Sequence, residues 1–525
     1  MRIARLRFTP ILFLRAAGFR SSLSSATEPN FIATQPSPDI QFQTDTMASQ
    51  LSDFSFKRIR VASGDDIDRL YPVLAAYIQN PSLASTVTEL VIDFPTWPSY
   101  PSRTSTQPAV GPDEVAAHAQ MEAYGRALGL SDEATTSMLQ SLSWKFNPQP
   151  SEDKSGRHSY KPKSDRGFAS AALVLLLSLC PNITLIQAYE LNRLPPPNPL
   201  GDFLLRNNYG QLPVTYLQRL ERVHLQAWYP DDNREYDRLA FLDYFRLFGR
   251  LPALRTYSAN AVVNYQATRE YAPPGSSPSI TNISITNADV SSGMLSQIIR
   301  VPRALENFTL SLGGLSFFEG GYAYVSPKTL GKCLLEQKTT LKSLDLDVAA
   351  MLGFGMKEEE EEGYDEDEYE EDDDIIGRDE YFRLDEQAGN GRPARSSELP
   401  NTRPYGTTIG SLHDFEALEH LAISVRLILG GDGNPPFRLV DALPRTLKSF
   451  TLYDYVAGKS SAADEHVQEL KEKMEERFPF LKEVKGLDEP LIKNSKYNDN
   501  SGYDEKNPSE LVVSRRMVNR GLNWE

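Results

Sequence analysis

The segment TTLKSLDLD, residues 339–347, spaces three leucines as L-x-x-L-x-L and predicts a short β-strand. A helix-like run, SPKTLGKCLLEQK (326–338), comes directly before it. The same hydrophobic spacing recurs along the chain, and its first positions are residues 87, 183, 220, 254, 280, 305, 341, 418, 447 and 481. Most intervals between them are 25–37 residues, in the range typical of repeat proteins.

Helix-like segments lie between these strand segments. Residues 291–302 and 464–478 both repeat apolar side chains at helical spacing, and the second segment places Glu469 and Lys473 one helical turn apart. Strands that alternate with helices, without hairpin turn sequences, predict a parallel sheet. One such unit cannot bury its apolar strand face alone, whereas a stack of units can.

The sequence therefore predicts an α/β fold of the leucine-rich-repeat-like solenoid kind, with irregular repeats and a curved parallel sheet backed by helices. An irregular α/β protein of several domains is the alternative, since the repeats vary in length. One repeat, CPNITLIQA (180–188), fits the spacing in two registers, Ile183–Ile186–Ala188 and Cys180–Ile183–Leu185.

Composition divides the chain into a leader at 1–46, the solenoid at 47–485 and a polar tail at 486–525. Residues 1–27 are rich in arginine and serine and contain no acid, which is typical of a mitochondrial transit peptide. An unstructured or disordered leader is the alternative, and Met47 would then be a sensible second start.

Two insertions lengthen the predicted solenoid. Residues 99–165 combine helix-like and loop-like segments, and residues 355–405 contain an acidic block. The block at 358–374 holds 14 acids while the whole chain has a net charge of −16, so the rest is close to neutral. Like charges at this density repel one another, which predicts a disordered acidic insertion. It is either a solvated loop or an attractant for a basic partner protein.

Composition also bears on partners and compartment. No region carries the basic stripe of a nucleic-acid-binding protein. The most apolar run, 171–180, has half of the ~20 residues needed to span a bilayer, which indicates a buried helix and no membrane partner. Cys180 and Cys333 lie in apolar runs, so we expect buried thiols in a reducing compartment. We therefore expect an intracellular protein of the cytoplasm or nucleus, or of mitochondria if residues 1–27 are a transit peptide.

Sequence signatures of catalysis are absent. The six histidines are scattered without metal-ligand spacing, and no P-loop, G-x-S-x-G or H-E-x-x-H sequence occurs. We therefore expect no catalytic residue, cofactor or metal, and a protein that is not an enzyme. An enzyme with an unrecognised site in the 99–165 insertion is the alternative. Asn182, Asn282 and Asn307 stand in glycosylation triplets inside predicted strands, so we expect them to be unmodified.

The candidate binding surface follows from strand geometry. In L-x-x-L-x-L-x, the third, fifth and seventh residues point away from the apolar core, onto the concave face of the sheet. These positions are polar and nearly uncharged, as in a broad protein-binding surface or a merely solvated strand face. The candidate residues are Arg222, His224, Gln226, Asn282, Ser284, Asn307, Thr309, Ser343, Asp345, Asp347, His420 and Tyr453. Trp228 and Tyr229 are further candidates for aromatic anchors.

Four segments carry a family resemblance: LYPVLAAYIQNPSLASTVTELVIDF (70–94), LLLSLCPNITLI (175–186), LPALRTYS (251–258) and CLLEQKTTLKSLDLD (333–347). In their order and their helix-then-strand arrangement the chain resembles the fungal F-box proteins with degenerate leucine-rich repeats, over about residues 51–485. The resemblance implies a substrate receptor of an SCF-type cullin–RING ubiquitin ligase, in which an F-box docks an adaptor and the repeats hold the target protein.

The F-box itself is not found. Residues 1–50 lack its Leu-Pro start and its three apolar helices, so no adaptor-docking residue carries over to this chain. We therefore expect a non-enzymatic protein-interaction module that acts as a degenerate ligase receptor. A plain repeat scaffold in another compartment, such as mitochondria, and the enzyme named above are the alternatives.

Overall fold

The computed structural model describes residues 54–93, 112–146, 167–189, 198–226, 241–260, 262–264, 277–290, 292–312, 327–348, 407–430 and 437–491, with the single residues 191, 239, 325 and 435. All of them belong to one compact unit, Phe54–Glu525. The expected leader at 1–46, the acidic insertion at 355–405 and the tail beyond residue 491 lie outside the described residues, as do Trp228 and Tyr229. None of the described helices is long and apolar enough to cross a membrane.

A single open parallel sheet organises the described residues. Eleven strands pair in the order β1-β2-β3-β4-β5-β7-β8-β9-β10-β11-β12, and β6 pairs with β7 beside this path. The strands are β1 Arg58–Val61, β2 Glu89–Ile92, β3 Leu185–Tyr189, β4 Arg222–Gln226, β5 Thr256–Asn260, β6 Val263–Asn264, β7 Asn282–Val290, β8 Asn307–Leu312, β9 Ser343–Asp347, β10 His420–Ser424, β11 Ser449–Tyr453 and β12 Glu483–Lys485. The prediction of an α/β fold with a parallel sheet backed by helices is confirmed.

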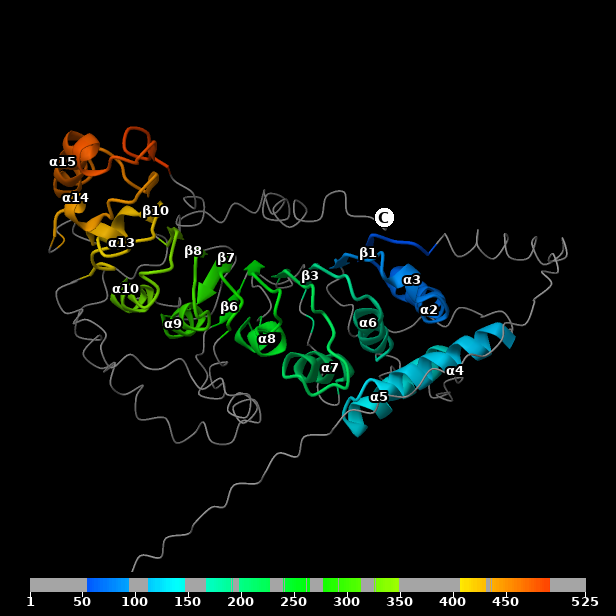
Figure 1. Ribbon diagram of the computed structural model, residues 1–525. Coiled ribbons are helices and arrows are strands. Elements are labelled where there is room, and N and C mark those ends of the chain that lie inside the picture. The colour runs from blue at the N-terminus through cyan, green and yellow to red at the C-terminus, as the bar shows by residue number, and fades with distance from the viewer. Residues whose placement is uncertain are drawn as a thin grey trace, which may run out of the picture. The chain divides into compact units, whose positions relative to one another are not determined.

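Helices connect the strands. They are α2 Gly64–Gln79, α3 Pro81–Ala84, α4 Pro112–Ala127, α5 Asp132–Phe146, α6 Phe168–Leu179, α7 Pro199–Asn208, α8 Phe241–Phe248, α9 Ser292–Arg300, α10 Pro327–Leu335, α13 Val425–Leu429, α14 Leu439–Ala442 and α15 Ser461–Arg477. Helices α6 to α10 lie side by side along one face of the sheet (Figure 1). The apolar faces of these helices and of the strands form one continuous core, as expected for stacked units.

One backbone pattern recurs at every junction along the eleven-strand path. The carbonyl of Lys57, the residue before β1, accepts hydrogen bonds from the amides of Thr88 (2.9 Å) and Glu89 (3.2 Å). The same paired acceptance occurs at the carbonyls of Thr88, Thr184, Glu221, Arg255, Thr281, Glu306, Lys342, Glu419 and Lys448. Neighbours in this series flank both 99–165 and 355–405, so neither insertion interrupts the pairing of strands.

The register of residues 180–188, which the sequence left ambiguous, is fixed by the neighbouring strands. Ile186 on β3 pairs with Leu90 on β2 and with Val223 on β4. The first, fourth and sixth positions of the hydrophobic spacing here are therefore Ile183, Ile186 and Ala188, and each is at most 2% exposed. The first of the two registers that the sequence allowed is the one present.

Helix α6 explains why residues 112–146 fold with the rest of the chain. It is apolar on every side, and all of its residues except the last are buried. A helix of this kind needs cover all round, and α5 packs against both α6 and α7 while α4 packs against α2. Met138 and Leu142 of α5 are fully buried. The described part of the expected insertion thus contributes to the hydrophobic core. The expected burial of Cys180, at the end of α6, is also confirmed, as is that of Cys333.

A buried glutamine joins α9 to β8. The side-chain nitrogen of Gln337, which is 5% exposed, donates to the carbonyls of Ile299 and Pro302, both at 3.1 Å. Its oxygen accepts from the amide of Leu305 at 3.1 Å. These three backbone groups lie where the helix ends and the next strand approaches, and one side chain satisfies all of them.

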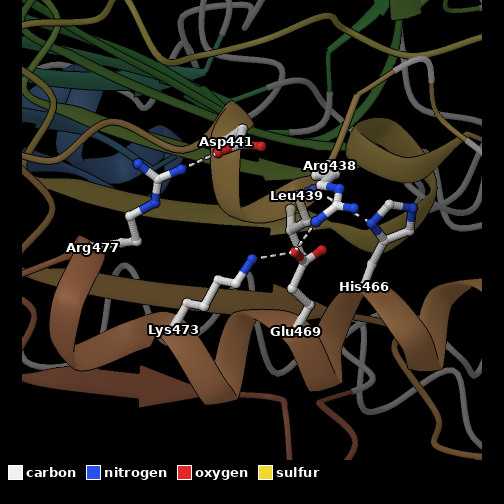
Figure 2. A network of polar contacts seen from close by, with 7 residues as sticks. All are labelled: Arg438, Leu439, Asp441, His466, Glu469, Lys473 and Arg477. Atoms are coloured by element: carbon white, nitrogen blue, oxygen red, sulfur yellow. Dashed lines mark hydrogen bonds and ion pairs between the residues drawn. The ribbon is translucent and has the colours of Figure 1, made fainter.

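Ion pairs join α15 to α14 and to Arg438, the residue before α14 (Figure 2). Oε1 of Glu469 accepts from Arg438 at 2.5 Å and from Lys473 at 2.7 Å. Arg477 donates to Asp441. The predicted contact between Glu469 and Lys473 within one helix is therefore confirmed, and the same carboxylate also reaches the neighbouring element.

Candidate binding face

The third and fifth positions of the hydrophobic spacing lie on the side of the sheet opposite the helices, which we call the open face. On β8 the polar residues Asn307, Thr309 and Ser311 are half-buried, while Phe308 and Leu310 between them are buried. This alternation is the two-residue period of a strand. It places the polar residues on the open face and the apolar residues against the helices, as the sequence predicts.

Amides and hydroxyls form a ladder across three central strands. Thr256, Asn282 and Asn307 occupy matching positions on β5, β7 and β8. The side-chain amide of Asn282 donates to Oγ1 of Thr256 at 3.4 Å, and that of Asn307 donates to Oδ1 of Asn282. The fifth positions of the same strands are Ser258, Ser284 and Thr309. We call these six residues the central patch, a surface of hydroxyls and amides without charge.

His224 borders the central patch on β4. Its Nδ1 lies 2.8 Å from Oγ of Ser258, and its Nε2 is buried without a hydrogen-bond partner. Burial lowers the pKa of His224, so the ring is neutral at pH 7. Arg222, two residues earlier on the same strand, is exposed. The sequence-predicted pair on β4 therefore divides into an exposed cation and an enclosed neutral imidazole.

The three seventh-position candidates contribute little exposed surface. Gln226, Asp347 and Tyr453 are only 4%, 4% and 5% exposed. They were predicted to lie exposed on the open face because the prediction used only the alternation along each strand. At the carboxyl ends of the strands, contacts between neighbouring strands enclose the side chains: Oγ of Ser424, for example, accepts from the amide of Val348 at 3.2 Å.

Tyr453 reaches across a whole strand. It belongs to β11, and its hydroxyl donates to Oδ1 of Asp345 on β9 at 3.0 Å. β10 lies between them, and its residues beside Tyr453 and Asp345 are the small Ser424 and Ala422. The aromatic ring can cross β10 because these two side chains leave room for it.

The remaining candidates on β9 and β10 are less enclosed. Ser343 is half-buried, and His420 beside it is exposed. Nδ1 of His420 lies 2.8 Å from Oγ of Ser449 on β11. The open face thus ends toward β12 in polar side chains that bond to one another across strands.

Strand β1 supplies charged residues that the sequence analysis missed. Arg58 pairs with Glu89 at 2.6 Å, and Arg60 pairs with Asp93 at 2.5 Å. Burial raises the pKa of Asp93, although Arg60 opposes that shift. The sequence RIRV (58–61) alternates charged and apolar residues, which is the pattern of a half-buried strand. It was missed because it precedes the first full copy of the hydrophobic spacing. These pairs neutralise the β1 end of the open face.

A series of polar contacts links α2 to α4, a helix of the 99–165 region. Tyr71 of α2 lies 3.0 Å from Nδ1 of His118 on α4, and Nε2 of that histidine lies 3.3 Å from Glu122. Burial raises the pKa of Tyr71 and lowers that of His118. These contacts attach α4 to α2.

Comparison of the chain with protein-family models, with curated proteins and with solved structures finds no match. Within the described ranges, no three His, Cys, Asp or Glu side chains gather where they could hold a metal ion. The open face is therefore the feature on which a functional proposal rests.

Proposed function

We propose that this protein is a leucine-rich-repeat-like solenoid that binds other proteins through its open face. The observation that carries the proposal is the junction pattern, in which ten successive strand junctions repeat the same paired hydrogen bonds. A structure built by repetition presents equivalent side-chain positions at regular spacing, which suits the binding of an extended partner. Eleven strands at about 4.8 Å would give such a surface roughly 50 Å of length.

The chemistry of the open face favours a protein partner. The central patch offers hydroxyls and amides that are half-buried, and such groups bind the backbone and uncharged side chains of a partner by hydrogen bonds. Ion pairs at the β1 end neutralise the charges there. This pattern offers little to a polyanion, whose binding needs a continuous row of cations.

The cellular role that we propose is substrate receptor of a cullin–RING ubiquitin ligase, acting through a degenerate form of the F-box architecture. This part of the proposal rests on the resemblance of residues 70–94, 175–186, 251–258 and 333–347 to the fungal F-box proteins with leucine-rich repeats. A scaffold that carries the same face without ligase association is the alternative role.

The test is affinity capture with tagged chains that start at Met1 and at Met47. Both are compared with the variant Ser284→Trp, which places a large ring in the centre of the open face. Gln79→Trp is the matched control, because Gln79 is exposed on α2, in the helical layer. Partners lost with Ser284→Trp and kept with Gln79→Trp support binding through the open face.

An adaptor and a cullin among the captured partners support the ligase role. Their absence from both baits, with other partners retained, overturns the ligase role and leaves the scaffold. Partners that bind equally well to Ser284→Trp and to the unchanged chain overturn the proposal that the open face is the binding surface. Circular dichroism and thermal melting establish that each variant is folded.

A further inference from the structure

The charges next to the central patch differ at its two borders. On β4 the adjoining third position is Arg222, which is exposed. On β9 the adjoining fifth position is Asp345, which is half-buried and accepts a hydrogen bond from Tyr453. The patch is therefore bounded by a cation on one strand and by an anion on the other. An uncharged surface four strand intervals wide separates them.

The geometry sets a spacing for any partner that meets both charges. Four strand intervals of about 4.8 Å amount to about 19 Å, and a shift of two residues along the strands brings the separation to about 20 Å. An extended peptide advances about 3.3 Å per residue, so about six residues cover this distance. Side chains six residues apart in an extended peptide point to the same side, since the period is two.

We infer that the open face binds an extended protein segment that carries an acidic side chain at Arg222 and a basic side chain at Asp345, about six residues apart. This inference rests on the proposed function, because it names the partner of the same face. The five intervening residues lie over the central patch and are uncharged where they face it. A charged side chain there would lose water and gain only neutral partners, which is costly.

Two contacts prepare the borders for such a partner. The hydroxyl of Tyr453 holds the carboxylate of Asp345 from the β11 side at 3.0 Å, which fixes its position on the sheet. On the other border, the imidazole of His224 is held by Ser258 at 2.8 Å, and it is neutral, so it does not add a second cation beside Arg222. The face thus carries one positive and one negative border position.

The probes are synthetic peptides of twelve residues with a serine- and threonine-rich centre. Two peptides carry aspartate and lysine six residues apart, one in each order along the chain. Control peptides replace both charges with asparagine and glutamine, or set them three residues apart. Binding is measured by fluorescence anisotropy at low and at physiological salt, because partly exposed charge contacts weaken with salt.

We expect one order of charges to bind about twofold to thirtyfold more tightly than its uncharged control, because it makes two exposed ion pairs and each contributes at most about fivefold. The variants Arg222→Glu and Asp345→Lys should each lose this preference. The double variant should bind the peptide with exchanged charges. Arg222→Gln and Asp345→Asn provide milder changes if the reversals destabilise the fold. Equal binding of charged and uncharged peptides, or no binding by any peptide, overturns the inference.

The same variants separate this inference from the proposed function. One outcome is that captured partners are lost with Ser284→Trp but kept with Arg222→Glu and Asp345→Lys. That result supports the open face as the binding surface and refutes the inference that the bound segment carries the two charges. Partners that bind equally well to the Ser284→Trp variant refute the proposal that the open face is the binding surface. Partners lost with all three variants, together with the peptide preference, support both.

Discussion

Tyr453 and Asp345 are separated by 108 residues in the sequence and by one strand in the sheet, and the tyrosine hydroxyl donates to the aspartate across that strand. The contact joins β9 and β11, which lie on either side of residues 355–405 in the sequence. It also holds Asp345, which borders the central patch, in place on the sheet.

A double-mutant cycle measures this contact. Tyr453→Phe, Asp345→Ala and the double variant should give a coupling free energy of about 1–2 kcal/mol, as for a hydrogen bond to a carboxylate. Urea denaturation supplies the free energies of unfolding. Tyr216→Phe paired with Asp345→Ala is the control, since Tyr216 lies far along the chain, before β4, and should show no coupling. Coupling below about 0.3 kcal/mol in the first cycle would contradict the contact.

Gln337→Leu should lower the free energy of unfolding by about 3 kcal/mol or more. The change leaves the carbonyls of Ile299 and Pro302 and the amide of Leu305 without their side-chain partner, and each buried unsatisfied group costs about 1–3 kcal/mol. The control is Gln218→Leu at an exposed position, which should change stability by less than about 0.5 kcal/mol. Equal effects of the two changes would refute the role of Gln337.

Stability should fall as the pH is lowered from 7 to 5. Burial lowers the pKa values of His118, His224 and His466 in the folded protein below the usual 6.5. The unfolded chain then takes up protons first as the pH falls, which favours unfolding by about 1.4 kcal/mol per pKa unit. Denaturation at several pH values should show a smaller slope for His118→Gln and His224→Gln. The exposed Gln79 is the control because it carries no titratable group, and Gln79→Ala should leave the slope unchanged.

Met138→Ala on α5 should cost about 2–5 kcal/mol, because Met138 is fully buried. Val115→Ala on α4 is the matched control, since Val115 is 51% exposed and its loss should change little. Thermal unfolding of both variants distinguishes a core element from a surface insertion. A negligible effect of Met138→Ala would mean that α5 is dispensable for the fold.

Glu469→Gln should reduce stability by at most about 1 kcal/mol, since its ion pairs with Arg438 and Lys473 are at the surface. Lys473, with Arg438, holds the pKa of Glu469 below 4.5, so the contribution is present above that pH and is lost as acid protonates the carboxylate. The difference from the unchanged protein should also shrink in 1 M salt. A difference that persists at pH 3 or in salt would contradict an ion-pair origin.

Local patterns were enough to predict the parallel sheet, because the apolar positions of each strand are set by a period of two and by the helix that precedes it. Strand β1 was missed because RIRV stands alone before the first complete copy of the spacing. The alternation also identified the residues of the central patch. It could not predict that Tyr453 crosses β10, because that contact depends on the small residues Ala422 and Ser424 of a different strand. The burial of Gln226 and Asp347 likewise depends on neighbours distant in sequence.

The pairing of β9 with β10 follows the same junction pattern as every other pair, although 72 residues separate Asp347 from His420. Backbone hydrogen bonds and the shared core therefore support their adjacency. Two polypeptides, one ending after Val348 and the other beginning near Thr407, should then find each other and rebuild the sheet. The protein should therefore be suited to fragment complementation, with the division placed in the acidic segment.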